Sequence, residues 1–171
     1  DILFVHSPLE ELDFMSQKFG TKRTTIMYNS FLLVGPKNDP ATITTAKNIQ
    51  DAMKKISISK ATFISRGDKS GTHTKEMSLW SSAGLNPVGK RWYHETGTGM
   101  GQTLSIASEK QAYTLSDAAT FLAMRKNLDL AAIYTNDELL KNYYSVIEIN
   151  CDKFPKVNCE GAKNLSVFLR S

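Results

Sequence analysis

The segment Ser65–Thr72, with the sequence Ser-Arg-Gly-Asp-Lys-Ser-Gly-Thr, concentrates hydrogen-bond donors at one point of the chain. It follows an apolar run and precedes a helical pattern, which predicts a loop between a buried strand and a helix. A helix N-terminus carries about half a positive charge and unpaired N–H groups, and Arg66 adds a permanent cation. The hydroxyls of Ser70 and Thr72 add donors, and Gly71 lets the backbone approach closely. The loop therefore has the chemistry to bind a small tetrahedral dianion.

Two other interpretations of this loop compete with anion binding. In the simpler one, Ser70 or Thr72 only caps the helix, and Arg66 pairs with Asp68 on the surface. In the other, Ser70 is a nucleophile, His73 its base and Asp68 the orienting group of a hydrolase. These three groups lie within six residues, however, and the sequence has no Gly-x-Ser-x-Gly elbow with a distant histidine. We therefore expect no enzymatic activity, and we expect His73 to face solvent.

Two further loops favour anion binding because they repeat the donor-rich composition at the same predicted edge of the fold. They are Gly97–Gly101 and Thr114–Asp117. The glycine-rich loop lacks the Lys-Ser/Thr ending of a phosphate-binding P-loop, and it also lacks the acidic residue and βαβ setting of a dinucleotide fingerprint. It is therefore a weak signal for a nucleotide site, and by itself it could be a plain turn.

The elements that must position these loops alternate between strand and helix. Short apolar runs predict strands, and a 3.6-residue periodicity predicts helices. The predicted strands span residues 2–5, 26–34, 61–65, 91–95, 112–115, 130–134 and 144–149. The predicted helices span residues 9–19, 43–56, 70–83, 102–109, 116–126 and 154–171, with Ser116 as the cap of the fifth. This order predicts an α/β fold with mainly parallel pairing, in which ligands bind at the carboxyl ends of the strands.

Length, composition and charge exclude several classes of protein. A chain of 171 residues with 41% hydrophobic content suits one domain or two small lobes. Its longest apolar stretches, such as Phe31–Val34 and Leu130–Ile133, are far shorter than the roughly 20 residues that cross a bilayer. The net charge of +4 would permit a nucleic-acid partner, but the basic residues are scattered and not interleaved with aromatics, so we expect none. The first residues lack signal-peptide features, and we expect any export signal to lie outside this sequence.

Cys151 and Cys159 lie eight positions apart near the end of the chain. Neither a histidine nor a further cysteine stands at metal-site spacing from them, so we expect no metal site, and no pattern calls for a cofactor. The residues alone leave two alternatives open, a local disulfide and two buried free thiols. A location outside the cytoplasm would favour the disulfide.

Five successive motifs resemble those of the periplasmic tungstate-binding proteins of ABC transporters. They are Ile2–Pro8, Met27–Phe31, Val34–Lys37, Ser65–His73 and Glu95–Gly101. Their order and spacing also resemble that family, and the resemblance covers nearly the whole chain. The Arg-Gly-Asp-Lys-Ser-Gly-Thr core alone is also similar to the Arg-x-Asp-x-Ser-Gly-Thr loop of phosphate-binding proteins. The flanking motifs favour tungstate.

The resemblance implies a type II periplasmic-binding-protein fold. In this fold two α/β lobes, joined by crossover strands, close over a ligand and present it to a membrane permease. The first lobe would comprise residues 1–35 and 139–171, without its N-terminal part, and the second lobe residues 36–138. The implied ligand is tungstate, with molybdate as a second candidate, so that metal would enter only as the oxyanion. The implied location is periplasmic or extracellular, with a lipid anchor in the full protein.

The resemblance also implies roles for individual residues. Arg66 would be the charge partner of the anion, and Asp68 would orient Arg66. The implied ligand-binding residues are Arg66, Ser70, Gly71, Thr72, Thr98, Gly99 and Met100. The first four would act at the helix start, and the last three would border the cleft.

The sequence departs from the family pattern in two places. Family members begin with a Thr/Ser-rich loop that contacts the anion and with a further stretch of the first lobe, which this sequence does not contain. The segment Asp117-Ala118-Ala119-Thr120 stands where the family usually has Asp-Arg-Gly-Thr, so a second cation is missing there. Two alternative functions stay open, because fold does not fix function. One is a phosphate-binding protein of similar fold, and the other is the effector-sensing domain of a transcription regulator.

Overall fold

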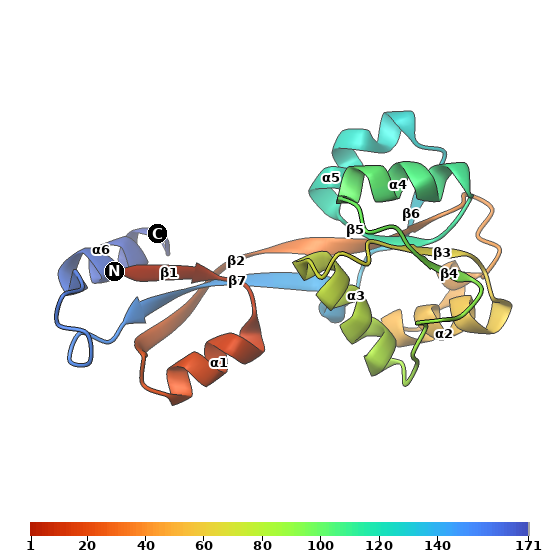
Figure 1. The fold of residues 1–171 in the computed structure, drawn as a ribbon. Coiled ribbons are helices and arrows are strands. Elements are labelled where there is room, and N and C mark those ends of the chain that lie inside the picture. The colour runs from red at the N-terminus through yellow and green to blue at the C-terminus, as the bar shows by residue number, and fades with distance from the viewer. Residues whose placement is uncertain (171) are drawn as a thin grey trace. The chain divides into compact units, whose positions relative to one another are not determined.

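The computed structural model describes residues 1–170, apart from the side chain of Leu9. The chain forms two compact units (Figure 1). Unit 1 comprises Asp1–Asn29 and Asn142–Ser171, and unit 2 comprises Ser30–Lys141. Ser171, the last residue of the predicted terminal helix and of the predicted first lobe, lies outside the described residues.

The helices and strands follow the predicted order. The α-helices are α1 (Pro8–Ser16), α2 (Ile49–Ser59), α3 (Gly71–Ser82), α4 (Met100–Glu109), α5 (Ala118–Met124) and α6 (Cys159–Phe168). The strands are β1 (Ile2–Val5), β2 (Gly20–Gly35), β3 (Phe63–Ser65), β4 (Tyr93–Glu95), β5 (Thr114–Asp117), β6 (Ala131–Tyr134) and β7 (Lys141–Ile149). Short 3₁₀ turns lie at Ile43–Thr45, Arg125–Asn127 and Glu138–Leu140. The main differences from prediction are a longer β2 and a shorter terminal helix.

In unit 2, the strands that are followed by helices run in one direction. β3 pairs parallel with β4, and Phe63 forms a parallel bridge with Tyr113, the residue before β5. β2 runs against this direction, because it pairs antiparallel with both β5 and β6. The prediction of mainly parallel pairing is therefore wrong for β2, and also for β1, which pairs antiparallel with β7. The reason is connectivity, since β2 enters unit 2 directly from unit 1 and not through a helical crossover.

Two hydrophobic cores cover the two faces of the unit 2 sheet. Side chains alternate between the faces along β2: Phe31 and Leu33 enter the core with α2 and α3, and Leu32 and Val34 enter the core with α4 and α5. Figure 1 shows the same arrangement, with α2 and α3 on one side of the strands and α4 and α5 on the other. Because fully burying one such side chain stabilises the fold by roughly 1.5–3 kcal/mol, the sheet is a firm support for the loops at its edge.

A buried tyrosine holds the segment after β2 in place. The Tyr113 hydroxyl donates a hydrogen bond to Asp39 Oδ1 (2.6 Å) and accepts one from the Ala41 N–H (2.9 Å). Its ring lies against Gly35, where an added Cβ would stand 2.3 Å from the Tyr113 Cδ1 atom. Position 35 therefore requires glycine, and the aromatic ring fills the space a side chain would take.

Unit 1 combines a three-strand arrangement with two helices and a disulfide. Its strands are in the order β1-β7-β2. The Glu11 carboxylate of α1 is 2% exposed and forms an ion pair with Arg23 of β2 at 2.6 Å. Cys151, which follows β7, forms a disulfide with Cys159, the first residue of α6. Of the two alternatives for these cysteines, the structure has the disulfide.

The first prediction concerns the Tyr113 hydroxyl. Tyr113→Phe leaves the buried Ala41 N–H without its partner and removes one hydrogen bond to the Asp39 carboxylate, which keeps those from Ile43 and Thr44. We therefore expect the free energy of unfolding to fall by about 1–3 kcal/mol. Urea titration followed by circular dichroism measures this change. The matched control is Tyr134→Phe, because the Tyr134 hydroxyl is 3.5 Å from Asp137 Oδ2 and only partly buried. Equal losses in the two variants would contradict the role of Tyr113.

The second prediction concerns the disulfide. It closes a short loop, which stabilises the fold by about 2–3 kcal/mol in the chain-entropy model. Reduction should therefore lower the melting temperature by about 4–12 °C. Cys151→Ser combined with Cys159→Ser should show the same lower value without reductant. Unreduced protein with two thiols open to alkylation would contradict the prediction, and mass spectrometry detects them.

Candidate functional site

Two of the three predicted loops are joined by hydrogen bonds at the end of β3 and β4. The Thr96 N–H donates to the Ser65 carbonyl (3.0 Å), and the Gly97 N–H donates to the Arg66 carbonyl (2.8 Å). The third predicted loop, Thr114–Asp117, is wrong as a loop, because it forms strand β5 itself. The carbonyl of Tyr113, the residue before β5, accepts a hydrogen bond from the Ile64 N–H (2.8 Å). β3, β4 and β5 therefore run in the same direction and end at the same edge, where the first two predicted loops and the start of α5 lie.

The guanidinium of Arg66 is fixed on two sides. Its Nε and Nη2 atoms donate to Asp68 Oδ2 at 3.1 and 2.5 Å, and Nη1 donates to the Thr72 hydroxyl at 3.4 Å. The two charged side chains are 18% and 21% exposed, so this pair is partly buried and does not lie on the open surface. The Asp68 carboxylate thus holds the cation beside the first turn of α3.

Asp68 stays ionised at neutral pH. Burial opposes its charge, but hydrogen bonds from the Ser70 side chain and N–H and the charge of Arg66 outweigh this effect and lower the pKa of Asp68 to about 2. Its Oδ1 accepts from the Ser70 N–H at 3.1 Å. The loop therefore keeps its ion pair throughout the physiological pH range.

The start of α3 is capped within the loop. The Ser70 hydroxyl accepts from the His73 N–H at 3.4 Å, which is the capping role of the simpler interpretation. The imidazole of His73 accepts from the Lys69 N–H at Nδ1 (3.1 Å), and its Nε2 lies 3.9 Å from Glu95 Oε1. The prediction that His73 faces solvent is wrong, since its side chain is only 15% exposed between the loop and β4.

Two backbone positions in this loop have left-handed φ angles. Gly67 has φ +60°, and an added Cβ there would stand 2.6 Å from Glu95 Cβ, so glycine is required. Lys69 has φ 58°, an unfavourable conformation for lysine that the hydrogen bond to His73 compensates. The loop is therefore held in one conformation by contacts on both of its sides.

A cluster of threonine hydroxyls shapes the second loop. Thr96 Oγ1 lies 3.0 Å from Thr98 Oγ1 and 3.2 Å from Thr103 Oγ1, and Thr103 Oγ1 donates to the Gly99 carbonyl (3.1 Å). Gly99 is the N-cap of α4 and has no side chain to bond the first N–H groups of that helix. The Met100 side chain is buried in the core, which leaves its backbone N–H as its contribution to a site.

The last residue of β5, Asp117, caps the helix that follows the strand. The Asp117 carboxylate accepts from the Thr120 N–H at 2.8 Å and begins α5. The prediction that Ser116 caps this helix is wrong, because Ser116 is fully buried within β5. The strand continues two residues further than its apolar pattern indicates, to Asp117, and the capping position moves from Ser116 to Asp117.

Sequence reasoning missed the residues that support the site from below. Thr96 and Thr103 order the second loop. The carboxyl group of Glu76, a residue of α3, is buried beneath the first loop. The spacing of Glu76 and Trp80 was an available signal, because residues four apart on a helix lie together and an indole N–H needs an acceptor when buried. The threonine contacts depend on tertiary structure and have no local signal.

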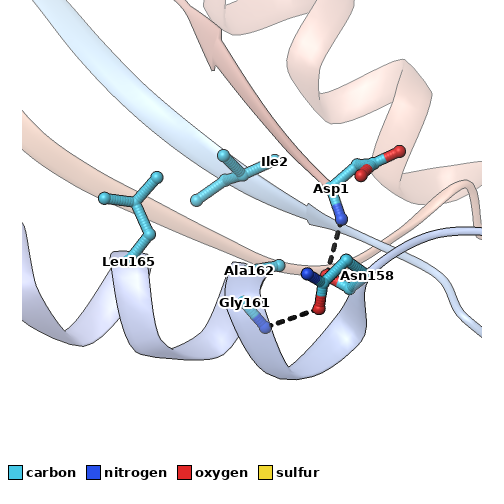
Figure 2. Close-up of a pocket in the computed structure, with 6 residues that line it drawn as sticks. All are labelled: Asp1, Ile2, Asn158, Gly161, Ala162 and Leu165. Carbon is cyan, nitrogen blue, oxygen red and sulfur yellow. Dashed lines mark hydrogen bonds between the residues drawn. The ribbon is translucent and has the colours of Figure 1, made fainter.

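A pocket in unit 1 has a different character (Figure 2). It is lined by Asp1, Ile2, Asn158, Gly161, Ala162 and Leu165. The Asp1 amine donates to the Asn158 carbonyl at 2.7 Å, and the Gly161 N–H donates to the Asn158 side chain at 2.8 Å. These polar groups bond one another, and the remaining wall is mostly aliphatic. None of the predicted ligand-binding residues belongs to this pocket.

Within residues 1–170, neither a membrane-spanning helix nor a metal-binding cluster of side chains is found. No helix in this part of the chain is long and apolar enough to cross a membrane. Across the same residues, histidine, cysteine, aspartate and glutamate side chains do not form any group of three or more that could hold a metal ion.

The chain matches a known family over almost all of its length. A family model described as a PBP superfamily domain matches residues 1–170. The tungstate-binding protein TupA of Peptoclostridium acidaminophilum is 45% identical over 173 residues, which cover 100% of this chain and 60% of that protein. The chain thus spans less than two thirds of the length of this curated relative.

Solved structures show the same relationship. The tungstate-binding protein TupA from Desulfovibrio alaskensis G20 is 39% identical with a TM-score of 0.94, and the match covers 100% of this chain and 70% of that one. The tungstate ABC transporter structure from Geobacter sulfurreducens is 45% identical with a TM-score of 0.77, with 100% and 72% covered. A LysR substrate binding domain of a putative periplasmic protein from Wolinella succinogenes is 36% identical with a TM-score of 0.82, with 100% and 74% covered.

These matches confirm the predicted α/β binding-protein fold, and they confirm that the family is one of binding proteins and not of enzymes. The chain therefore belongs to the PBP superfamily, in which it is a homologue of the tungstate-binding proteins.

Proposed function

We propose that this chain is the larger part of an extracytoplasmic solute-binding protein that captures tungstate, with molybdate as a second ligand, and delivers it to an ABC permease. The observation that carries the proposal is the arrangement of Arg66 and Thr72. The Arg66 guanidinium is held beside the Thr72 hydroxyl at the start of α3, at the edge where the α4 N-terminus also lies. The 45% identity to a protein named as tungstate-binding supports the choice of ligand.

Seven residues form the proposed binding set. They are Arg66, Ser70, Gly71, Thr72, Thr98, Gly99 and Met100. Arg66 supplies charge, and the α3 and α4 starts supply backbone N–H groups whose dipoles also favour an anion. Thr72 and Thr98 supply hydroxyls that can turn from their present partners toward a ligand.

The donor-rich set favours an anion that carries no proton. Phosphate is usually protonated once near pH 7 and would need an acceptor, for which Asp68 is the candidate in this loop. Both oxygens of Asp68 already accept hydrogen bonds, from Arg66 and from the Ser70 N–H. Tungstate and molybdate carry no proton at neutral pH, so they need only donors.

Several further features of the protein belong to this proposal. The two compact units would be parts of the two lobes, and residues beyond this chain would complete the anion site, since the curated relative is longer. A periplasmic or extracellular location is supported by the disulfide and by the relative described as a putative periplasmic protein. A lipid anchor on the full-length protein would keep it near the permease.

The third prediction concerns ligand choice. Calorimetry on the full-length protein with tungstate, molybdate, sulfate and phosphate should give the highest affinity for tungstate or molybdate and the lowest for phosphate. The scarcity of free acceptors in the site explains the low affinity for phosphate, and the preference for tungstate or molybdate over sulfate rests on the similarity to the tungstate-binding relative. Preferential binding of phosphate would overturn the proposed ligand and support the phosphate-binding alternative.

The fourth prediction concerns Arg66. A charge-assisted hydrogen bond contributes about 1.5–3 kcal/mol, so Arg66→Ala should weaken tungstate binding by roughly 10- to 150-fold or more. Arg66→Lys should restore only part of this loss, because a lysine cannot copy the contacts to both Asp68 and Thr72. The matched control is Lys69→Ala, which removes a neighbouring exposed cation from the same loop. Equal affinities of the wild type and Arg66→Ala would show that the site lies elsewhere.

A further inference from the structure

A carboxyl group lies buried beneath the proposed anion site. Glu76 is 2% exposed, and its Oε1 accepts hydrogen bonds from the Tyr93 hydroxyl (2.7 Å) and the Trp80 indole N–H (3.2 Å). The Ser65 side chain is a third hydrogen-bond partner. These partners come from β3, β4 and α3, so the carboxyl joins the three elements that define the first two loops.

Ser65 connects this carboxyl to the anion loop. The Ser65 hydroxyl, which bonds Glu76, also accepts from the Gly67 N–H at 3.2 Å. Gly67 follows Arg66 directly and fixes the turn of the loop. On α3, Thr72 and Glu76 are four residues apart and lie on the same face, about 6 Å from each other along the helix axis. An anion bound at Arg66 and Thr72 would therefore lie near Glu76, and the loop that binds it would be linked to Glu76 through Ser65.

A negative charge at this place opposes the ligand. The groups that act on the carboxyl are three neutral hydrogen-bond partners and the like charge of Glu95, and none of these is a cation. Arg66 is already paired with Asp68. An ionised Glu76 would thus add repulsion to a site that attracts a dianion, whereas a protonated Glu76 keeps the hydrogen-bonded network without the charge.

Resting on the proposed function, we infer that Glu76 is a positioning residue of the oxyanion site and that it carries a proton when the anion is bound. Capture of the anion is then coupled to uptake of a proton by a buried side chain that does not touch the ligand. The coupling works through two routes, the charge repulsion and the Glu76–Ser65–Gly67 hydrogen bonds beneath the loop.

The pKa of Glu76 lies close to neutral pH, so that anion binding can change its protonation state. Burial is the largest influence and raises the pKa of Glu76 to about 7, although hydrogen bonds from Ser65, Tyr93 and Trp80 act in the opposite direction. A bound dianion raises this pKa further. Affinity is therefore fully present below pH 7, falls as pH rises above 7, and levels off where Glu76 is ionised in both the free and the bound protein.

The experiment is calorimetry of tungstate binding to the full-length protein between pH 6.5 and 8.5. We expect the wild-type affinity to fall roughly tenfold or more over this range, because the ionised carboxylate repels the dianion. Titrations at pH 7.5 in two buffers with different ionisation enthalpies should show uptake of about half a proton per anion. Glu76→Gln, which keeps the acceptor oxygen and loses the charge, should bind with little dependence on pH and without proton uptake.

Two further variants separate Glu76 from other causes. Tyr93→Phe removes a hydrogen bond that lowers the pKa of Glu76, so the decline in affinity should move to higher pH. His73→Gln removes the imidazole that contacts the Lys69 N–H of the same loop, and it should keep the wild-type dependence of affinity on pH. Melting curves establish that each variant is folded.

The outcomes distinguish this inference from the proposed function. Tight tungstate binding with a flat pH profile and no proton uptake would overturn the role of Glu76 and leave the proposed function intact. Proton uptake that persists in Glu76→Gln and disappears in His73→Gln would also overturn it. Absence of tungstate binding at every pH in the wild type would overturn both.

Discussion

The candidate site depends on the parallel pairing of β3 with its neighbours. β3 is only three residues long, yet it pairs with β4 on one side and bridges Tyr113 on the other. This pairing makes the chain leave three neighbouring strands in the same direction and at the same edge. Arg66, the threonine cluster and Asp117 would otherwise belong to separate loops. The buried Phe63 and Ile64, one on each face, hold β3 between the two cores.

Much of this arrangement could be predicted from the sequence. An apolar run followed by Ser65–Thr72 and then by a helical pattern was enough to place the first loop at a strand end and a helix start. The same reasoning placed Gly97–Gly101. The predictions that were wrong depend on contacts between residues far apart in the sequence. The direction of β2 depends on the unit from which it comes, and the burial of His73 depends on Glu95 from another strand. Ser116 failed as a cap because tertiary packing extends β5 to Asp117.

For the first loop, the simpler interpretation of a helix cap and an ion pair is compatible with the proposed anion binding. Ser70 does cap α3, and Arg66 does pair with Asp68. These are the contacts that fix the guanidinium in one orientation, since an arginine without them would have several rotamers to lose on binding. In the proposed site, the local ion pair and the cap would thus hold the donors in place before a ligand binds. The buried polar network around Glu76 extends this support one layer deeper.

Unit 1 is assembled from the two ends of the chain, whereas unit 2 is one continuous segment. During synthesis, all of Ser30–Lys141 leaves the ribosome before most of β7 and all of α6 do. Unit 2 can therefore fold while the first half of β2 still has no β7 to pair with, and the exposed strand is open to wrong partners during that interval. The contacts that close unit 1 join residues far apart in sequence, which makes their formation slow compared with the helices of unit 2. We therefore expect unit 2, which carries the proposed anion site, to fold before unit 1.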